Sequence, residues 1–563
     1  MHSKPHHSGV LARTLPLLRA ERGGLAVALV YSVAIGLLSL ALPVAVQALV
    51  NTVAFGSVLQ PVVVLAALVT GALAASALLY VLRAIVLETV QRRIFARQAS
   101  AVLDSLLRFQ VDAVDGQHVP ELVNRFLDVT TVQKSATILL IDGLTVAMQT
   151  LAGVLLLAAY HPYLLVFDLV LVFFIVLVVL GLGRGAVRTA IDESRAKYDV
   201  LAWLEEVARH SVTLRSSDGA RMATDEANRL VLGYLHHRGR HFRVLIRQIA
   251  GTQLLQAVAL ASLLGIGGYL VIGGELTLGQ LVAAELVVSL AVGSFAKFGK
   301  SLETFYDLQA ALDKLSHITG LPLEDGSTGS LHAGSRPGPA ALRFAGVGFS
   351  YGSRPILSGA QAEIRPGEKI AIHGRNAAGK STLLDLFYGL RDPQQGSLEL
   401  DGIDYRHIAK DDLRSAAMLI RGAEILPGTI AQNVTLGRDV PAGELKHALE
   451  HAGILQAVQD LPKGWDTQLT PSGRPLAPSE ALRLTFARAI LHKPRLLLVD
   501  EALDAIDDLH LEGHLVQTLF DPKAPWTLIA ATERPSLWPH FDRVYGLADG
   551  ALHNDAAALR GAN

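Results

Sequence analysis

Long apolar runs separated by polar segments fill the first half of the chain. Six of these runs reach the roughly 20 residues that a helix needs to cross a bilayer. They span residues 25–50, 62–86, 136–159, 163–182, 249–272 and 278–298. Because apolar stretches of this length are typical of membrane spans, the pattern predicts six transmembrane helices.

The connections between these runs differ in length and charge. Within each successive pair of runs the connection is short and contains no Lys or Arg. Residues 91–134 and 184–247 are instead long, helical in pattern and rich in arginine. The positive-inside rule places such basic connections in the cytoplasm. We therefore expect a cytoplasmic tail at 1–23, a six-helix domain at 24–319, and a multi-pass protein of the cytoplasmic (inner) membrane with both termini in the cytoplasm.

The pattern changes at residues 320–339, where Gly, Ser and Pro leave too few apolar residues to build a helix or strand. We interpret this segment as a linker between domains. Beyond it, strand-like apolar runs such as 369–373 and 496–501 alternate with helical stretches. That alternation is typical of a sheet flanked by helices. The predicted fold class is an all-α six-helix transmembrane domain followed by an α/β domain at 340–563.

Composition agrees with a membrane protein and excludes several classes of site. Hydrophobic residues make up 51% of the chain, and the formal net charge is −1. A charge this close to zero gives no broad basic surface for nucleic acid. The chain has no cysteine, which excludes disulfides, thiolate metal sites and cysteine catalysis.

The segment GRNAAGKS, residues 374–381, has the spacing of a phosphate-binding loop. A buried strand is predicted before it and a helix after it, which is the structural setting that this motif requires. Gly374 and Gly379 allow the backbone to approach phosphate oxygens, Lys380 balances phosphate charge, and Ser381 can bind Mg²⁺. The remaining predicted contacts to ATP in this segment are Arg375, Asn376, Ala377, Ala378 and Thr382.

Two carboxylates end the later apolar run LLLVDE. We assign Asp500 to the Mg²⁺ shell together with Ser381, and Glu501 as the base that positions or activates the attacking water. The phosphate loop and this acidic strand end together predict a nucleotide-hydrolysing P-loop domain.

At this point the chain resembles ATP-binding cassette (ABC) exporters over nearly its whole length. The resemblance is carried by the phosphate loop, by GTIAQNV at 428–434 and by FARAILHKPRLLLVDEALDAID at 486–507. It implies that Tyr351 stacks on adenine and that Asp507 belongs to the D-loop. Such cassettes work as a two-cassette sandwich, so the resemblance implies a half-transporter that dimerises with a second half-transporter, as a homodimer or a heterodimer.

Several motifs depart from the family pattern. Arg421 stands where the family has a glutamine that helps to hold magnesium, and Glu533 stands at the switch histidine. The signature LSGGQ is replaced by LAPSE, in which Ala477 lacks a hydroxyl and Pro478 lacks a backbone donor. Pro471 replaces an expected glutamate. We expect ATP binding to survive and hydrolysis to be slow.

Two further hypotheses concern charged residues. Arg421 and Glu533 place opposite charges at the positions of the family's glutamine and histidine, which suggests either an ion pair between them or independent drift. Among the charges within or near the apolar runs, we expect Arg83 and Asp142 to be hydrated near helix ends. Asp168 and Glu285 are the better candidates for a transport cavity.

The predicted function is that of an ATP-dependent exporter that binds MgATP, hydrolyses it slowly and alternates access to a membrane cavity for an unidentified substrate. One alternative is an ATP-binding membrane protein that regulates or gates with little turnover. Another is the degenerate half of a heterodimeric exporter.

Overall fold

The computed structural model describes residues 19, 21–55, 59–115, 123, 125–324, 336–506 and 513–555. The chain forms two compact units. One contains Met1–Arg108 and Gly116–Leu321, and the other contains Phe109–Asp115 and Pro322–Asn563. We call them the helical unit and the α/β unit. The short segment Phe109–Asp115 therefore belongs with the second unit although it interrupts the first in sequence.

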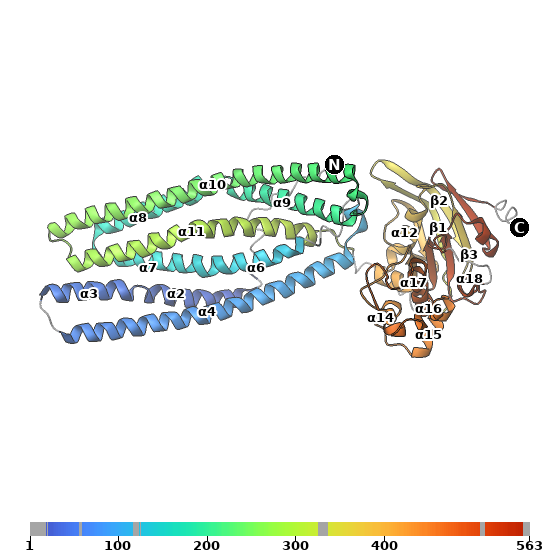
Figure 1. The fold of residues 1–563 in the computed structure, drawn as a ribbon, viewed down its shortest axis with the longest axis horizontal. Helices are drawn as coiled ribbons and strands as arrows, with labels where there is room; N and C mark the ends of the chain where they lie inside the picture. The colour runs from blue at the N-terminus through green and yellow to red at the C-terminus, as the bar shows by residue number, and fades with distance from the viewer. Residues whose placement is uncertain are drawn as a thin grey trace. The chain divides into compact units, whose positions relative to one another are not determined.

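Helices make up the helical unit (Figure 1). They are α2 (Arg22–Leu38), α3 (Ala41–Phe55), α4 (Leu59–Arg108), α6 (Asp128–Ile138), α7 (Leu144–Tyr160), α8 (Pro162–Val176), α9 (Ala186–Arg209), α10 (Ser217–Ile272) and α11 (Leu278–Thr319). The π-helical turn η3 (Leu139–Gly143) joins α6 to α7, and the π-helical turn η4 (Leu177–Leu182) extends α8. The 3₁₀ turn η2 (Arg125–Leu127) precedes α6, and the 3₁₀ turn η5 (Thr213–Arg215) precedes α10. Each of the six predicted apolar runs is helical where the structure describes it, apart from a short turn at Ser39–Leu40.

Four of the described helical spans are long and apolar enough to cross a membrane: Arg22–Thr52, Val62–Arg108, Pro162–Arg209 and Ser217–Ile272. Two shorter apolar helices, Ala147–Tyr160 and Leu278–Leu290, coincide with the third and sixth predicted runs. At 1.5 Å per residue, the 56 residues of α10 extend about 84 Å, far more than the roughly 30 Å of a hydrocarbon core. Such a helix continues well outside the bilayer.

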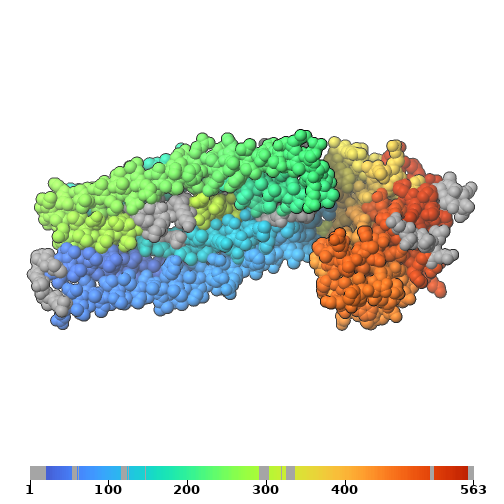
Figure 2. All heavy atoms as spheres, viewed as in Figure 1, coloured from blue at the N-terminus to red at the C-terminus, as the bar shows by residue number. Residues whose placement is uncertain are grey.

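Close helix packing in this unit depends on small residues. The helices lie side by side along their lengths (Figure 2). A Cβ atom at Gly36 of α2 would lie 2.7 Å from the Cβ of Met148 on α7, and one at Gly267 of α10 would lie 2.3 Å from a methyl group of Leu281 on α11. Glycine at these places lets the backbones approach closely, as is common between membrane helices.

The α/β unit contains two main sheets. The antiparallel sheet has the order β2-β1-β4-β5, and the second sheet has the order β12-β11-β3-β10-β9-β6, in which all pairings except β11 with β12 are parallel. The strands are β1 (Leu342–Tyr351), β2 (Arg354–Ile364), β3 (Lys369–His373), β4 (Gln395–Leu400), β5 (Ile403–Asp404), β6 (Ala417–Ile420), β9 (Leu496–Asp500), β10 (Thr527–Ala531), β11 (Arg543–Ala548) and β12 (Ala551–Asn554). A two-stranded sheet pairs β7 (Gly428–Thr429) with β8 (Gln468–Leu469).

Helices pack around the parallel sheet of this unit (Figure 1). They are α12 (Lys380–Tyr388), α13 (Lys410–Ala416), α14 (Ile430–Thr435), α15 (Ala442–His451), α16 (Leu455–Gln459), α17 (Pro478–His492) and α18 (His514–Phe520). The described part of this unit also contains the 3₁₀ turns η1 (Val111–Val114), η6 (Tyr405–His407), η7 (Gly464–Asp466) and η8 (Pro535–His540).

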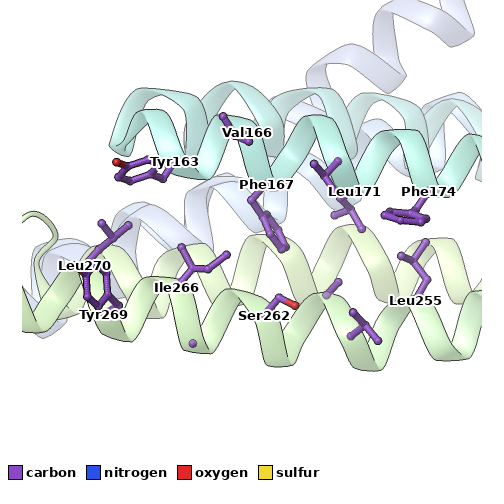
Figure 3. A pocket seen from close by; sticks show the side chains of 14 residues that line it. Tyr163, Val166, Phe167, Leu171, Phe174, Leu255, Ser262, Ile266, Tyr269 and Leu270 are labelled. Carbon is purple, nitrogen blue, oxygen red and sulfur yellow. The ribbon is translucent and has the colours of Figure 1, made fainter.

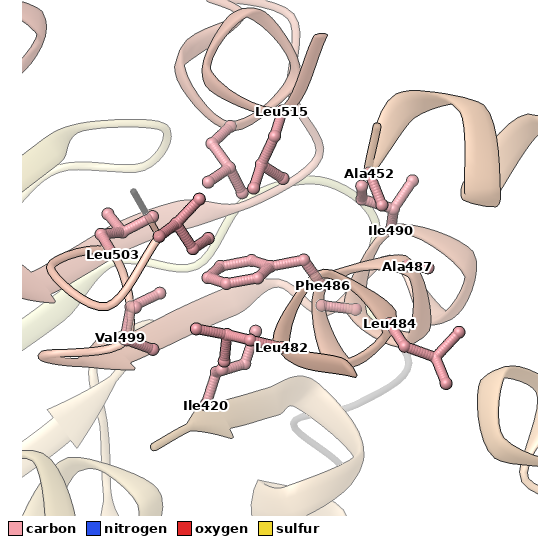
Figure 4. Close-up of a cluster of buried hydrophobic side chains, with 14 of the residues drawn as sticks. Ile420, Ala452, Leu482, Leu484, Phe486, Ala487, Ile490, Val499, Leu503 and Leu515 are labelled. Atoms are coloured by element: carbon pink, nitrogen blue, oxygen red, sulfur yellow. The ribbon is translucent and has the colours of Figure 1, made fainter. Parts of the chain in front are cut away.

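Strand β9, which lies between β10 and the edge strand β6, is buried on both faces. Leu497 and Val499 belong to one hydrophobic cluster, and Leu496 and Leu498 belong to another. This alternation follows from the two-residue period of a strand. Phe486 of α17 is completely buried in the first cluster, among Leu482, Val499 and Leu503 (Figure 4). The packed strand holds Asp500 at its carboxyl end, where the candidate site lies.

Candidate functional site

The phosphate-binding segment occupies the turn between β3 and α12, as the sequence predicts. Gly379 adopts φ 106° just before α12, and a Cβ atom there would lie 2.7 Å from a methyl group of Ile356. At Gly374 a Cβ atom would lie 2.5 Å from the carbonyl oxygen of Leu547. These two positions therefore require glycine, because any larger residue would clash with neighbouring strands.

A pocket of about 470 Å³ opens over this turn. It brings together most of the predicted contacts to ATP. Its lining residues are Tyr351, Arg354, Ile356, Asn376, Ala377, Ala378, Gly379, Lys380, Ser381, Thr382 and Glu501. The hydroxyl of Tyr351 lies 3.3 Å from that of Thr382, which places the candidate adenine-stacking ring beside the start of α12. Gly374 and Arg375 belong to the same turn without lining the pocket.

Lys380, at the end of the phosphate turn, is paired with the carboxylates of Glu533 and Glu501. Its Nζ donates to Glu533 at 2.8 Å and to the carbonyl oxygen of Gly374 at 2.6 Å, and it lies 3.3 Å from Glu501. Burial lowers the pKa of Lys380, but Glu533 and Glu501 more than offset that effect, so its pKa lies above the ordinary value. The ammonium group is thus charged and already paired.

Glu533 occupies a position suited to an anion. The same oxygen that accepts from Lys380 also accepts from the backbone N–H of Gly374 at 2.9 Å. Burial raises the pKa of Glu533, but these two donors hold it below its ordinary value. A phosphate group entering the turn would compete with this carboxylate for both donors.

Arg421 makes three contacts at the far side of the same turn. Its Nε donates to Asp500 at 2.9 Å, and its Nη2 donates to Asp385 and, at 3.2 Å, to the carbonyl oxygen of Ser381. The described residues contain no ion pair between Arg421 and Glu533. The hypothesis of a direct pair is therefore not supported, because each residue has a nearer and more buried partner of opposite charge.

The donor set around Asp500 does not fit an ordinary magnesium site. The hydroxyl of Ser381 lies 3.1 Å from one oxygen of Asp500, so the two predicted ligands are adjacent. The other oxygen of Asp500 is bound by Arg421, and only 6% of the Asp500 side chain is exposed. A guanidinium has only donors and cannot ligate a metal. A fixed cation therefore already neutralises one of the two predicted magnesium ligands.

Sequence reasoning missed a second layer of charges beside Tyr351. Asp385 of α12 binds Arg421 through one oxygen and Arg391 through the other, at 3.3 Å. The guanidinium carbon of Arg391 lies 4.8 Å from the centre of the Tyr351 ring. Asp385 follows Ser381 by one helical turn, and that spacing was the available signal.

Arg391 also binds the segment Phe109–Asp115. Its Nη1 and Nη2 donate to Asp115 at 2.8 Å and 2.7 Å, and Nη1 also binds Asp112. Arg414 similarly binds both oxygens of Glu324 at 2.7 Å and 2.6 Å. No local pattern predicted these pairs, because they join residues far apart in sequence.

The predicted base and the altered residues of the signature segment are all partly or fully exposed. Glu501 adopts φ 56°, an uncommon conformation for a residue other than glycine, and half of its side chain is exposed. Ala477 and Pro478 are exposed at the start of α17, where the backbone N–H of Ala477 donates to Glu480 at 2.7 Å. Asp507 lies outside the described residues.

In the helical unit, the expectation for Arg83 is wrong. Arg83 is fully buried and donates to Ser32 at 2.9 Å and to Thr145 at 2.7 Å, because hydroxyls on α2 and α7 face it. Asp168 is buried, with 2% exposure, whereas Glu285 is exposed. The side chain of Asp142 lies outside the described residues.

A cavity of about 660 Å³ lies between α8 and α10 (Figure 3). Its lining is mostly apolar and includes Phe167, Leu171, Leu255 and Ile266. The hydroxyl of Ser262 is one of few polar groups in it. Because such a lining gives few directional contacts, the cavity by itself selects no substrate class.

Two family models match the chain. A model described as an ABC transporter transmembrane region matches residues 25–295, and one described as ABC transporter matches residues 357–504. In fold, the chain is similar to a solved structure described as a bacterial Atm1-family ABC exporter with ATP bound. The TM-score is 0.80 at 23% identity, over 95% of this chain and 94% of the other. The predicted fold class is confirmed.

Curated relatives match with lower coverage. The chain is 27% identical over 362 residues to the mycobactin import ATP-binding/permease protein IrtB of Mycolicibacterium thermoresistibile, covering 63% of this chain and 62% of that protein. It is 26% identical over 530 residues to the mitochondrial ATP-binding cassette sub-family B member 10 of Mus musculus, covering 90% and 73%. The aligned part thus spans less than two thirds of the mycobactin import protein.

Proposed function

The chain belongs to the ABC transporter family, and from this premise we propose that it is a half-transporter that binds ATP and moves a substrate across a membrane. One observation carries the proposal. A glycine-dependent phosphate turn, with Lys380 at its end, is built at the β3–α12 junction of a chain that also carries membrane-spanning helices. Both parts are needed for transport driven by ATP.

The pocket over the turn supports roles for individual residues. Tyr351 stacks on the adenine ring, and the backbone donors of 374–382 together with Lys380 hold the phosphates. Glu501 is the candidate base for water attack. Ser381 and Asp500 are the predicted ligands for Mg²⁺, and Arg421 binds one oxygen of Asp500.

Hydrolysis by this cassette is proposed to be slow. Glu533 contributes a negative charge where the family has a histidine that contacts the γ-phosphate, and Glu501 is partly engaged by Lys380. Losing one preorganised contact to a transition state typically costs about 2.7 to 4 kcal/mol, or roughly a hundredfold to a thousandfold in rate. More than one such contact is missing here.

Assembly with a second half-transporter is part of the proposal. Ala477 and Pro478 are exposed at the start of α17, where a partner cassette would meet them. Neither supplies the hydroxyl or backbone donor that the family uses across the sandwich, so this chain would weaken the site on its partner. That effect applies to a homodimer and to a heterodimer.

We place the protein in the cytoplasmic (inner) membrane with both termini in the cytoplasm, from the arginine-rich long connections. The proposed direction of transport is outward, which the exporter-like fold supports. A relative that is named for import makes inward transport the competing outcome.

Purified protein in liposomes tests this function. Transporter activity predicts measurable ATP turnover that Glu501→Gln abolishes and that the surface control Glu444→Gln leaves unchanged. Lys380→Ala should remove ATP binding altogether.

A second candidate function, ATP-dependent gating without turnover, is favoured by the pairing of Lys380 with Glu533 and Glu501. It predicts tight ATP binding in the same liposomes with no phosphate release above the Glu501→Gln background.

A further inference from the structure

We propose that the guanidinium of Arg421 replaces the divalent cation of this nucleotide site, so that the cassette binds ATP without Mg²⁺. The inference deepens the proposed function and rests on it, because it concerns how the same pocket holds ATP.

Arg421 is anchored directly beside the two predicted metal ligands. Ser381 and Asp500 are the residues predicted to hold a metal between the phosphate turn and β9. Arg421 binds both of them, through the carboxylate of Asp500 at 2.9 Å and the carbonyl oxygen of Ser381 at 3.2 Å. The positive charge therefore neutralises Asp500 and lies beside Ser381, whose hydroxyl binds the other oxygen of Asp500.

A second carboxylate fixes the guanidinium there. Asp385 binds Nη2 of Arg421, and the side chains of Asp385 and Asp500 are 10% and 6% exposed. Burial lowers the pKa of Arg421, but these carboxylates more than offset it and the pKa lies above its ordinary value. Arg421 is a permanent cation held by two nearly buried anions.

A magnesium ion would have to displace this arrangement. Bringing a divalent cation to Asp500 would set it against the guanidinium, and like charges repel strongly in a poorly solvated site. Moving Arg421 away would break its contacts and leave Asp385 with one cation fewer, which is costly for a buried carboxylate. The resident cation is therefore favoured over the exchangeable one.

Arg421 also has the means to contact phosphate. About a third of its side chain is exposed, and no partner is recorded among the described residues for its Nη1. A guanidinium with free N–H groups binds phosphate oxygens well. Free ATP carries two more negative charges than its magnesium complex. Lys380 and Arg354 line the pocket and supply positive charge there, and Arg421 adjoins the pocket through its contact with Ser381.

The test measures ATP binding by the full-length protein in detergent or nanodiscs, once with MgCl₂ and once with EDTA. We expect the two dissociation constants of the natural protein to agree within about threefold. If Mg²⁺ made even one charge-assisted contact with ATP and the protein, its removal would weaken binding by roughly tenfold or more. ATP binding that weakens at least about tenfold in EDTA overturns the inference and leaves the proposed function standing. Absence of binding in both conditions overturns the proposed function and the inference with it.

Arg421→Gln supplies the matched variant. We expect it to lose about tenfold or more in ATP affinity in EDTA and to regain affinity when Mg²⁺ is added, because the amide oxygen can ligate a metal. Recovery with Mg²⁺ shows that the variant is folded. Arg406→Gln, which removes an exposed arginine paired with Asp404, should behave like the natural protein. If Arg421→Gln binds ATP in EDTA as well as the natural protein does, the inference is wrong.

Discussion

Arg391 binds both carboxylate oxygens of Asp115, with Nη1 and Nη2 at 2.8 Å and 2.7 Å. The pair joins the segment that directly follows α4 in the chain to a residue just beyond α12. Through Nε, Arg391 also binds Asp385, which binds Arg421. A continuous series of ion pairs therefore runs from Asp500 beside the phosphate turn to the segment Phe109–Asp115.

Asp115→Asn is expected to loosen that segment. Arg391 is almost fully buried, whereas Asp115 is partly exposed. We therefore expect the loss of this charged partner to weaken the attachment of the segment to Arg391 by about 1.5 kcal/mol, the lower end of the range for a hydrogen bond to a charged group. Hydrogen exchange of the amides at 109–115 should speed up roughly tenfold. Asp104→Asn, which removes an exposed pair with Arg108, is the control. Unchanged exchange in Asp115→Asn would show that the pair does not anchor the segment.

Glu533→Gln is expected to strengthen ATP binding. The substitution removes the carboxylate that occupies Lys380 and the N–H of Gly374, so phosphate no longer competes with a fixed anion. One charge-assisted contact corresponds to roughly a tenfold lower dissociation constant. Titration with a fluorescent ATP analogue measures it, and Glu444→Gln is the surface control. Equal or weaker binding by Glu533→Gln would contradict the competition.

The same carboxylate gives a prediction about pH. The pKa of Glu533 lies below its ordinary value of 4.5, so its pairing with Lys380 is complete above that value and is lost only as pH falls through the lowered pKa. The ratio of ATP dissociation constants between the natural protein and Glu533→Gln should therefore stay constant between about pH 6 and pH 8. A ratio that shrinks as pH falls within this range would mean that Glu533 titrates there.

Restoring a signature-like sequence at the start of α17 should raise ATP turnover. The double substitution Ala477→Ser with Pro478→Gly supplies a hydroxyl and a backbone donor at an exposed helix N-terminus. One recovered contact at a transition state gives about a hundredfold to a thousandfold, and less where other contacts are still missing. Phosphate release at saturating ATP measures the change. Ala477→Ser alone is the control for folding, because a serine at the N-cap of α17 should stabilise the fold by about 1 kcal/mol without restoring the backbone donor at residue 478. A double variant that is folded and no faster would argue against a role across the dimer.

Phe486→Ala should unfold the α/β unit more easily. Phe486 is fully buried among residues of α17, β9 and the turn that follows β9 (Figure 4), and removing such a ring typically costs about 3 to 5 kcal/mol. Chemical unfolding of the full-length protein should show it. Phe520→Ala, at a partly buried ring on the edge of the same cluster, should cost about 1 kcal/mol. Similar losses for the two variants would contradict the placement of Phe486 at the centre of the core.

Features that depend on neighbouring residues could be predicted from the amino-acid order. Apolar runs of membrane length became helices because each residue's partners in a helix lie within one turn of it. The phosphate turn between β3 and α12 followed from glycines at the two positions where a side chain would clash. The substitutions Arg421, Ala477, Pro478 and Glu533 were visible in the same way, as departures from a local pattern.

Partner choice among charged residues was decided by the tertiary structure. The sequence left open whether Arg421 and Glu533 form a pair, whereas in the structure Arg421 binds Asp385 and Asp500, and Glu533 binds Lys380. Arg391 and Asp115 carried no local signal at all. An ion pair depends on which opposite charge lies within a few ångströms and how well both are shielded from water. Folding sets those distances between residues far apart in the chain, which no local pattern contains.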